Sequence, residues 1–395
     1  MRTTTTLILV GLVTGCSDDG TAGGDTDPGT TSAITAATAD APGESGGDPS
    51  DGAPQTSGPD ATGDADPTVA SSASGSDTDG GDTAGDDAST GGESDPGTTC
   101  PPGPYADAPL SAMSVTATAL RGSSTSVGAG GLLEGPVWWN GALYLSHFWF
   151  QGQPPPANIL RYDGGALEVV FEGSGSNGLA IGPDGQLIGG DHLNGTISAF
   201  DPDAGTRSTV VESFEGQRFN SPNDLTVRSD GTLYFTDPTY QAPQPAPQAA
   251  TGVYRVDPSG VVEQFETSLS QPNGVTISPD ETALYVGHAG GLVRYDLNAD
   301  GTVVTPGEPF GNVFGGVDGM AVDCAGNLYV TLHAEGRIVV RSPAGDDLGE
   351  IQVAPQVTNA AFGGPDQQTL FITAGNPDAG DALYSIDLQI PGLPF

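Results

Sequence analysis

The stretch Gln271-Pro-Asn-Gly-Val-Thr276 is one of six related stretches that recur along residues 134–360. In each, a carboxylate or amide side chain precedes a short apolar run, and we call these six residues the openers. They are Glu134, Asn177, Asn223, Asn273, Asp318 and Asn359, at spacings of 43, 46, 50, 45 and 41 residues. A period of about 40–50 residues is typical of a four-stranded propeller blade. The spacing therefore predicts an all-β fold, a six-bladed β-propeller, with the openers gathered around one axis.

Within a repeat, short apolar strands alternate with turns rich in Gly, Asp and Pro. The strands expected in the third repeat are 224–228, 233–236, 252–256 and 261–265. The last repeat has only three such runs, whereas Met113–Leu120 precedes the first repeat and has no partner. We expect this spare strand to pair with the last repeat, which would close the ring and remove exposed strand edges.

The chain of 395 residues divides sharply by composition. Residues 17–99 contain 18 acidic residues, no basic residue and no aromatic residue. Such a segment cannot bury enough apolar surface to fold, so we expect a disordered linker over 16–99 and a folded domain over 100–395. The formal net charge of −40 argues against a nucleic-acid partner. We expect a monomer that binds a small molecule.

The N-terminus carries an export signal. Leu7–Val13 is an apolar run too short to span a membrane, so residues 1–15 are interpreted as a signal peptide. The following Cys16 ends a tetrad that resembles a bacterial lipobox, in which the cysteine is lipidated. We therefore expect an exported protein held to the cell envelope, at the outer membrane or cell surface, by lipid alone. Ordinary secretion with a chance cysteine is the alternative.

Two further cysteines remain, Cys100 at the end of the linker and Cys324 in a turn of the fifth repeat. In an oxidising compartment two thiols can form a disulfide, which would join the start of the domain to that repeat. Two independent free thiols are the alternative.

All four histidines of the chain occupy one position of the repeat, 13 to 15 residues after an opener. Because the second strand of a hairpin ends where the first begins, these residues should return to the mouth of the channel. The residues predicted there to contact substrate are His147, His192, Asp237, His288 and His333. Hydrogen bonding between neighbouring blades is the alternative role.

Two long loops follow the second strands of repeats 1 and 3, at 148–156 and 238–248. Trp149, Phe150 and Tyr240 would give a substrate pocket apolar walls, unless these are only proline-stiffened surface loops.

Among the openers, Glu134 and Asp318 alone are charged, and unpaired carboxylates are costly in a channel wall. A bound cation would resolve that cost. Carboxylate and amide oxygens suit Ca²⁺ or Mg²⁺, and Ca²⁺ fits a roomy site with asparagine oxygens better. Mn²⁺ or Zn²⁺ are further options, although Zn²⁺ is less favoured because no Cys lies in the ring. An Asn in Pro-Asn-Gly can also be merely a turn residue.

Residues 125–390 resemble the gluconolactonase/regucalcin family of six-bladed propellers. The resemblance rests on four motifs: Glu134-Gly-Pro-Val-Trp138, Ser221-Pro-Asn-Asp-Leu225, Pro272-Asn-Gly274 and Asp318-Gly-Met-Ala-Val-Asp323. It implies that Glu134, Asn273 and Asp318 hold a divalent cation, and that Asn223 completes the shell or contacts substrate. It also implies proton transfer by Asp318. Asn177 is assigned to substrate contact or to a structural role.

The resemblance implies hydrolysis of a lactone or similar cyclic ester. No Gly-x-Ser-x-Gly motif is present, which disfavours an acyl-enzyme route. Sugar-lactone members carry an Arg two residues before the position of Asn223, where this chain has Ser221, so a less polar lactone is expected. Hydrolysis of a phosphotriester-like substrate and a non-catalytic binding module are the alternatives.

Overall fold

The computed structural model describes residues 100–121, 131–149, 157–376 and 380–393. The predicted signal peptide, the predicted linker and Cys16 lie outside these residues. The regular structure of these described residues is β-strand, apart from one short 3-10 helix, η2 (His333–Glu335). No helix of the described part has the length and apolar character needed to span a bilayer.

Three sheets are four-stranded antiparallel meanders with consecutive strands side by side. The first contains β7 (Ser176–Ile181), β8 (Leu187–Asp191), β9 (Thr196–Asp201) and β10 (Thr206–Val211). The second contains β11 (Leu225–Val227), β12 (Leu233–Asp237), β13 (Gly252–Val256) and β14 (Val262–Glu266). The third contains β15 (Val275–Ile277), β16 (Ala283–His288), β17 (Gly291–Leu297) and β18 (Val303–Phe314). These three sheets follow the predicted repeat.

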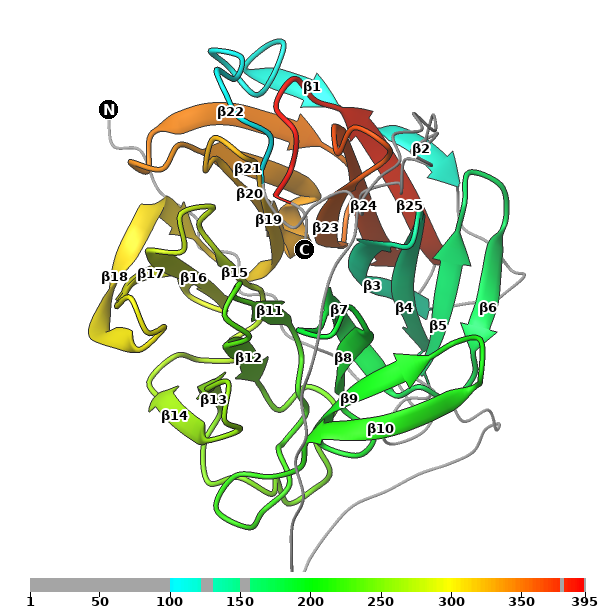
Figure 1. Ribbon diagram of the computed structural model, residues 1–395. Helices are drawn as coiled ribbons and strands as arrows, with labels where there is room; N and C mark the ends of the chain where they lie inside the picture. The colour runs from blue at the N-terminus through cyan, green and yellow to red at the C-terminus, as the bar shows by residue number, and fades with distance from the viewer. Residues whose placement is uncertain (1–99, 122–130, 150–156, 377–379, 394–395) are drawn as a thin grey trace, which may run out of the picture. The chain divides into compact units, whose positions relative to one another are not determined.

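A fourth sheet has the same meander and one additional strand. It contains β19 (Val317–Val322), β20 (Leu328–Leu332), β21 (Arg337–Arg341) and β22 (Asp347–Gln352), with β1 (Ser114–Thr116) parallel to β22. The sheets are arranged around a centre, with β7, β11, β15 and β19 innermost (Figure 1). The described chain is therefore an all-β, propeller-like fold.

The fifth sheet has eight strands and changes the predicted blade count. One half contains β3 (Gly131–Trp139), β4 (Ala142–Trp149), β5 (Ala157–Tyr162) and β6 (Leu167–Phe171). The other contains β23 (Val357–Gly363), β24 (Thr369–Asn376), β25 (Gly380–Asp387) and β2 (Thr118–Arg121). Four sheets are thus separate blades, and the prediction of six separate blades is corrected to four plus this joined sheet.

A single backbone pair, Gly375 with Leu132, joins the two halves. The close approach requires a glycine, because a Cβ on Gly375 would lie 2.7 Å from the Cα of Leu132.

The spare strand predicted over Met113–Leu120 is divided at Ala117. Its first part, β1, extends the fourth sheet, and its second part, β2, pairs antiparallel with β25 on the last repeat. The prediction is therefore right for β2 and wrong for β1. Ala117 donates its N–H to the Gln352 carbonyl at 2.9 Å, so the chain stays on β22 until it crosses to the next sheet.

Apolar side chains fill the spaces between neighbouring sheets. Ile188 and Ile197 of the first sheet pack in one cluster with Phe235 and Tyr254 of the second. The Phe235 and Tyr254 rings are stacked, with centroids 5.0 Å apart. Burying such aromatic faces is a large part of what holds adjacent sheets together.

A disulfide joins Cys100 to Cys324, with their Cα atoms 5.5 Å apart. The C-terminal segment meets the same turn, since Cys324 donates its N–H to the Pro391 carbonyl and Leu393 donates to the Val322 carbonyl. The two ends of the described chain are therefore fastened to the end of β19.

Candidate active site

The openers stand at the start of the six innermost strand runs. Glu134, Asn177, Asp318 and Asn359 lie inside β3, β7, β19 and β23, whereas Asn223 and Asn273 lie two residues before β11 and β15. Each of the six is at most 9% exposed. Polar side chains are seldom so deeply buried without a shared purpose or a partner.

Irregular pairing accompanies the four openers that lie within strands. The ladder register shifts between Glu134 and Val137, and equivalent shifts follow Ser176, Val317 and Val357. A β-bulge turns side chains away from their regular alternation and is common beside active sites. These bulges therefore explain how openers that begin apolar strands place their polar groups in the channel.

Hydrogen bonds connect the openers of neighbouring sheets around the channel. The Gly178 N–H donates to the Asn223 carbonyl at 2.7 Å, and the Gly274 N–H donates to the Asp318 carbonyl at 2.8 Å. The Thr236 hydroxyl donates to the Asn273 carbonyl at 2.6 Å. The backbone at the openers is thus braced from sheet to sheet, which gives a rigid frame for a site.

Three carboxylates influence one another inside this frame. Burial is the main reason that the pKa of Glu134 is well above its ordinary value, and the negative charges of Asp318 and Asp224 raise it further. The N–H of Gly135, 3.0 Å from Glu134 Oε2, opposes the rise. Mutual repulsion of buried carboxylates is the electrostatic signature of a site that is completed by positive charge.

Asp224 is the member of this group that our sequence analysis missed. Its carboxylate accepts the N–H groups of Leu225 at 3.0 Å and of Val275 at 3.2 Å, and burial raises its pKa to about 7. Asp224 directly follows the opener Asn223, so a pattern of one polar residue per repeat does not single it out. The signal that could have found it is the Asn223-Asp224 pair, a second acidic residue at the start of a strand buried on both faces.

Asn359, the last of the six openers, bridges two of the carboxylates. Its side chain hydrogen bonds to both Glu134 and Asp224, and its Oδ1 accepts the Ala360 N–H at 2.8 Å. Gly319 makes room for this amide, because a Cβ there would lie 1.9 Å from Asn359 Cγ. A glycine after Asp318 is therefore needed for the arrangement of the channel.

Asp318 has a second partner at the channel mouth. Its Oδ2 lies 2.9 Å from Nδ1 of His333, whose side chain is 37% exposed at the start of η2. Hydrogen bonding to Asp318 raises the pKa of His333 above its ordinary value. The His333 imidazole can thus hold the Asp318 carboxylate in one orientation and exchange protons with solvent.

The other residues predicted to contact substrate at the channel mouth lie in different surroundings from His333. His147 and His192 are fully buried, and the Nδ1 of His288 accepts the Gly290 N–H at 3.1 Å. Asp237 is also fully buried, and its carboxylate accepts the N–H groups of Asn220 at 2.9 Å and Ser221 at 2.8 Å. Burial raises the pKa of Asp237 to about 7. Asp237 therefore supports the loop that leads to Asn223.

Of the predicted loop aromatics, Tyr240 is the one whose side chain the structure describes; the side chains of Trp149 and Phe150 lie outside the described residues. Tyr240 is 49% exposed, and its side chain hydrogen bonds to Asn273. Burial, followed by the charge of Asp318, raises its pKa to about 12. Its hydroxyl thus remains a hydrogen-bond donor at neutral pH, close to two openers.

Arg218 does not replace the arginine that the family pattern has at Ser221. Its guanidinium donates to the carbonyls of His192 at 3.0 Å, Leu193 at 3.2 Å and Phe219 at 3.2 Å. The Ser221 hydroxyl donates to the Pro238 carbonyl at 2.8 Å. Both side chains therefore brace the backbone.

The openers offer side-chain oxygen atoms that could bind a cation. Within the described residues, no three His, Cys, Asp or Glu side chains lie close enough to form a metal site by themselves. A site at the openers would combine the carboxylates of Glu134 and Asp318 with the amides of Asn223 and Asn273. Such an all-oxygen set fits a hard cation. The positive charge of a cation bound there would offset the burial and the repulsion that raise the pKa of Glu134.

The chain resembles several known proteins. A gluconolactonase of Zymomonas mobilis is 35% identical over 278 residues, which cover 62% of this chain and 76% of that protein. A pentonolactonase of Haloferax volcanii is 28% identical over 283 residues, covering 66% and 92%.

Solved structures of a gluconolactonase and a regucalcin are also similar to this chain. A gluconolactonase from Xanthomonas campestris matches with a TM-score of 0.57 and 28% identity, covering 74% of this chain and 99% of that one. A calcium-binding regucalcin from Agrobacterium tumefaciens, 21% identical, has a TM-score of 0.57, covers 71% and 96%, and shares the fold. The family model of the SMP-30/Gluconolactonase/LRE-like region matches residues 132–376. The chain belongs to this family.

Proposed function

We propose that this protein is a lactonase that uses one divalent cation, held by Glu134, Asn223, Asn273 and Asp318. The observation that carries the proposal is the buried group of Glu134, Asp224 and Asp318, in which burial first, and then the charges of the two aspartates, raise the pKa of Glu134. A binding scaffold has no need of such a group, and the named gluconolactonase and pentonolactonase relatives support a lactone as substrate.

Ca²⁺ is the favoured cation because two carboxylates and two amides give an all-oxygen set whose two negative charges balance the cation. Mg²⁺ prefers a smaller octahedral shell with several waters, and Zn²⁺ prefers nitrogen or sulfur. When bound, the cation supplies a Lewis acid that polarises the lactone carbonyl.

The chain's own residues orient and deprotonate the attacking water. Asp318 is the proposed general base, and Nδ1 of His333, 2.9 Å from its Oδ2, fixes the orientation of the carboxylate. The proton accepted by Asp318 can pass to solvent through His333, which is partly exposed. Asn359 keeps Glu134 and Asp224 apart by hydrogen bonding to both.

The substrate is proposed to be a less polar lactone than a sugar lactone. The position that carries an arginine in sugar-lactone members is Ser221, and Arg218 is engaged with backbone carbonyls. Tyr240 beside Asn273 offers a hydroxyl and an aromatic face at the mouth, where Asn177 and Asn223 would also contact substrate.

The test compares purified wild-type protein with Asp318→Asn on a panel of aliphatic, aromatic and sugar lactones, with Ca²⁺ present. We expect hydrolysis that falls at least 100-fold in Asp318→Asn and remains in Asp366→Asn, a change at an exposed turn. Turnover of a phosphotriester with none of any lactone would favour the related hydrolase instead. No turnover of either substrate class would favour a binding module.

We also propose that the eight-stranded sheet represents two blades, so that the propeller has six. Its halves are each four-stranded and share one backbone pair, which supports counting them separately. The blade count can be checked in an experimental structure.

Export and lipid anchoring through Cys16 remain proposals. The disulfide between Cys100 and Cys324 supports an oxidising compartment. Metabolic labelling with a fatty acid should mark the wild-type chain, whereas a Cys16→Ser variant should be unlabelled and released from membranes. Labelling that persists in the variant would overturn the anchor.

A further inference from the structure

A hollow lies along the central channel, mainly beside the residues that follow the openers. It has a volume of about 750 Å³, and its walls come from the residues that follow the openers along the innermost strands. Val137, Thr226 and Thr276 are each three residues past an opener, which at about 3.3 Å per residue is roughly 10 Å along the strand. Asp224 and Asn359 of the candidate active site also line this hollow, whereas Glu134 and Asp318 do not.

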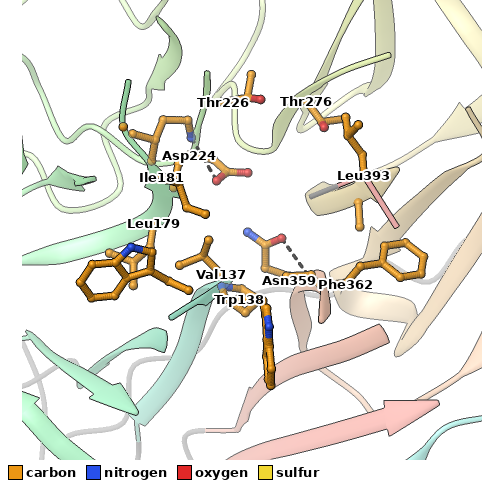
Figure 2. A pocket seen from close by; sticks show the side chains of 18 of the residues that line it. Val137, Trp138, Leu179, Ile181, Asp224, Thr226, Thr276, Asn359, Phe362 and Leu393 are labelled. Atoms are coloured by element: carbon orange, nitrogen blue, oxygen red, sulfur yellow. Dashed lines mark hydrogen bonds between the residues drawn. The ribbon is translucent and has the colours of Figure 1, made fainter. Parts of the chain in front are cut away.

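The walls of this hollow are apolar and partly aromatic. Val137, Trp138, Leu179, Ile181 and Phe362 come from three strands of two sheets and surround the space in Figure 2. Trp138 is held in place by stacking on Phe371, with centroids 5.7 Å apart. A cavity of this size with apolar walls is typical of a site for a small organic molecule.

Polar side chains also line the hollow, namely Asn140, Asp184, Asp224, Thr226, Thr276, Asn359 and Gln367. Thr226 is 3% exposed, and among the described residues its hydroxyl oxygen has no hydrogen-bond partner. A buried hydroxyl without a partner is uncommon and suggests a missing one. Thr276 lines the same hollow from the next sheet (Figure 2).

The charges present exclude an ionic ligand. The carboxylate of Asp224 would repel an anion, and its two oxygens already accept the N–H groups of Leu225 and Val275, which leaves little for a cation. Among the described residues no basic side chain lines the hollow, and the other acidic residue there, Asp184, is exposed. An uncharged molecule with a flat apolar body would pack against the walls, and its one hydroxyl group would hydrogen bond to Thr226.

We infer that this hollow is a second binding site, separate from the proposed catalytic centre, for a small uncharged aromatic alcohol. The inference does not depend on the proposed lactonase activity, because Thr226 and the apolar walls take no part in the proposed hydrolysis.

The test titrates the full-length protein with 2-naphthalenemethanol, followed by saturation-transfer NMR, with 2-naphthoate as the charged analogue. We expect the alcohol to bind at least tenfold more tightly than the anion. Thr226→Val, which keeps the shape of the side chain and removes the hydroxyl, should weaken binding about 3- to 10-fold, as loss of one neutral hydrogen bond does. Thr206→Val, on the exposed edge of β10, should bind as wild type.

A filling variant, Ala361→Trp, should abolish binding, since Ala361 lines the hollow. Asp318→Asn should leave it unchanged, which separates this site from the catalytic one. The inference is overturned if wild type shows no binding of the alcohol up to millimolar concentration, or if Thr226→Val and a folded Ala361→Trp both bind it as wild type does.

Discussion

Replacing Asp224 by Asn tests whether the channel really holds a carboxylate at an energetic cost. The folded-state pKa of Asp224 is about 7, raised by burial, against an ordinary value of about 3.9 in an unfolded chain. Because the folded-state pKa is the higher one, the unfolded chain loses this proton first as pH rises. The stability of the folded protein therefore falls as pH rises from about 4 to about 7, and the full loss persists above pH 7.

The magnitude follows from these two pKa values. A difference of about three pKa units corresponds to about 4 kcal/mol at pH 8, and to less than half of that at pH 5. An Asn side chain carries no charge but keeps only one acceptor for the N–H groups of Leu225 and Val275. That lost hydrogen bond costs about 1 kcal/mol at every pH. The advantage of Asp224→Asn over wild type should thus grow by about 2–3 kcal/mol from pH 5 to pH 8.

The assay is urea unfolding of the full-length protein at pH 5, 6, 7 and 8, with divalent cations removed by a chelator. Saturating Ca²⁺ provides the control, because a cation in the channel stabilises the Asp224 carboxylate and should flatten the pH dependence of the difference. A stability difference between variant and wild type that stays constant from pH 5 to pH 8 without cations would refute the reasoning.

Three further outcomes are expected. NMR titration of the cation-free protein should give His333 a pKa above 6.5, because Asp318 hydrogen bonds to it, and the pKa should fall when Ca²⁺ is added; no change with Ca²⁺ would argue against Asp318 as a ligand. Replacing Cys100 and Cys324 together by Ser should lower the free energy of unfolding by about 2–5 kcal/mol in urea, whereas an unaltered value would show the bridge to be dispensable. Tyr240→Phe should raise the KM for a lactone several-fold with Ca²⁺ affinity intact, since only the hydroxyl beside Asn273 is lost; an unchanged KM would remove Tyr240 from the substrate site.

The repeat could be predicted because spacing alone reports it. Polar residues before apolar runs at intervals of 41 to 50 residues required inner strands at those places, and β3, β7, β19 and β23 contain their openers. The joining of the first and last repeats could not be read in the same way. It depends on one backbone approach at Gly375, which tertiary packing determines.

The candidate site was predictable in its acidic residues and less so in their partners. Glu134 and Asp318 stand out as charges in apolar strands, whereas Asp224 escaped notice because it shares its repeat with Asn223. The histidines share one repeat position but not one environment: His147 is fully buried while His333 is partly exposed and bonded to Asp318. Small differences in where each second strand ends decide this, and periodicity cannot resolve them.

The central claim, that the openers form a cation site, is tested most directly by calorimetric titration of the chelator-treated full-length protein with Ca²⁺. We predict one Ca²⁺ per wild-type chain, and loss of measurable binding in Glu134→Gln, which removes a ligand charge but retains the side-chain shape. A wild-type chain that binds no Ca²⁺, or a Glu134→Gln variant that binds it as tightly as wild type, would contradict the claim.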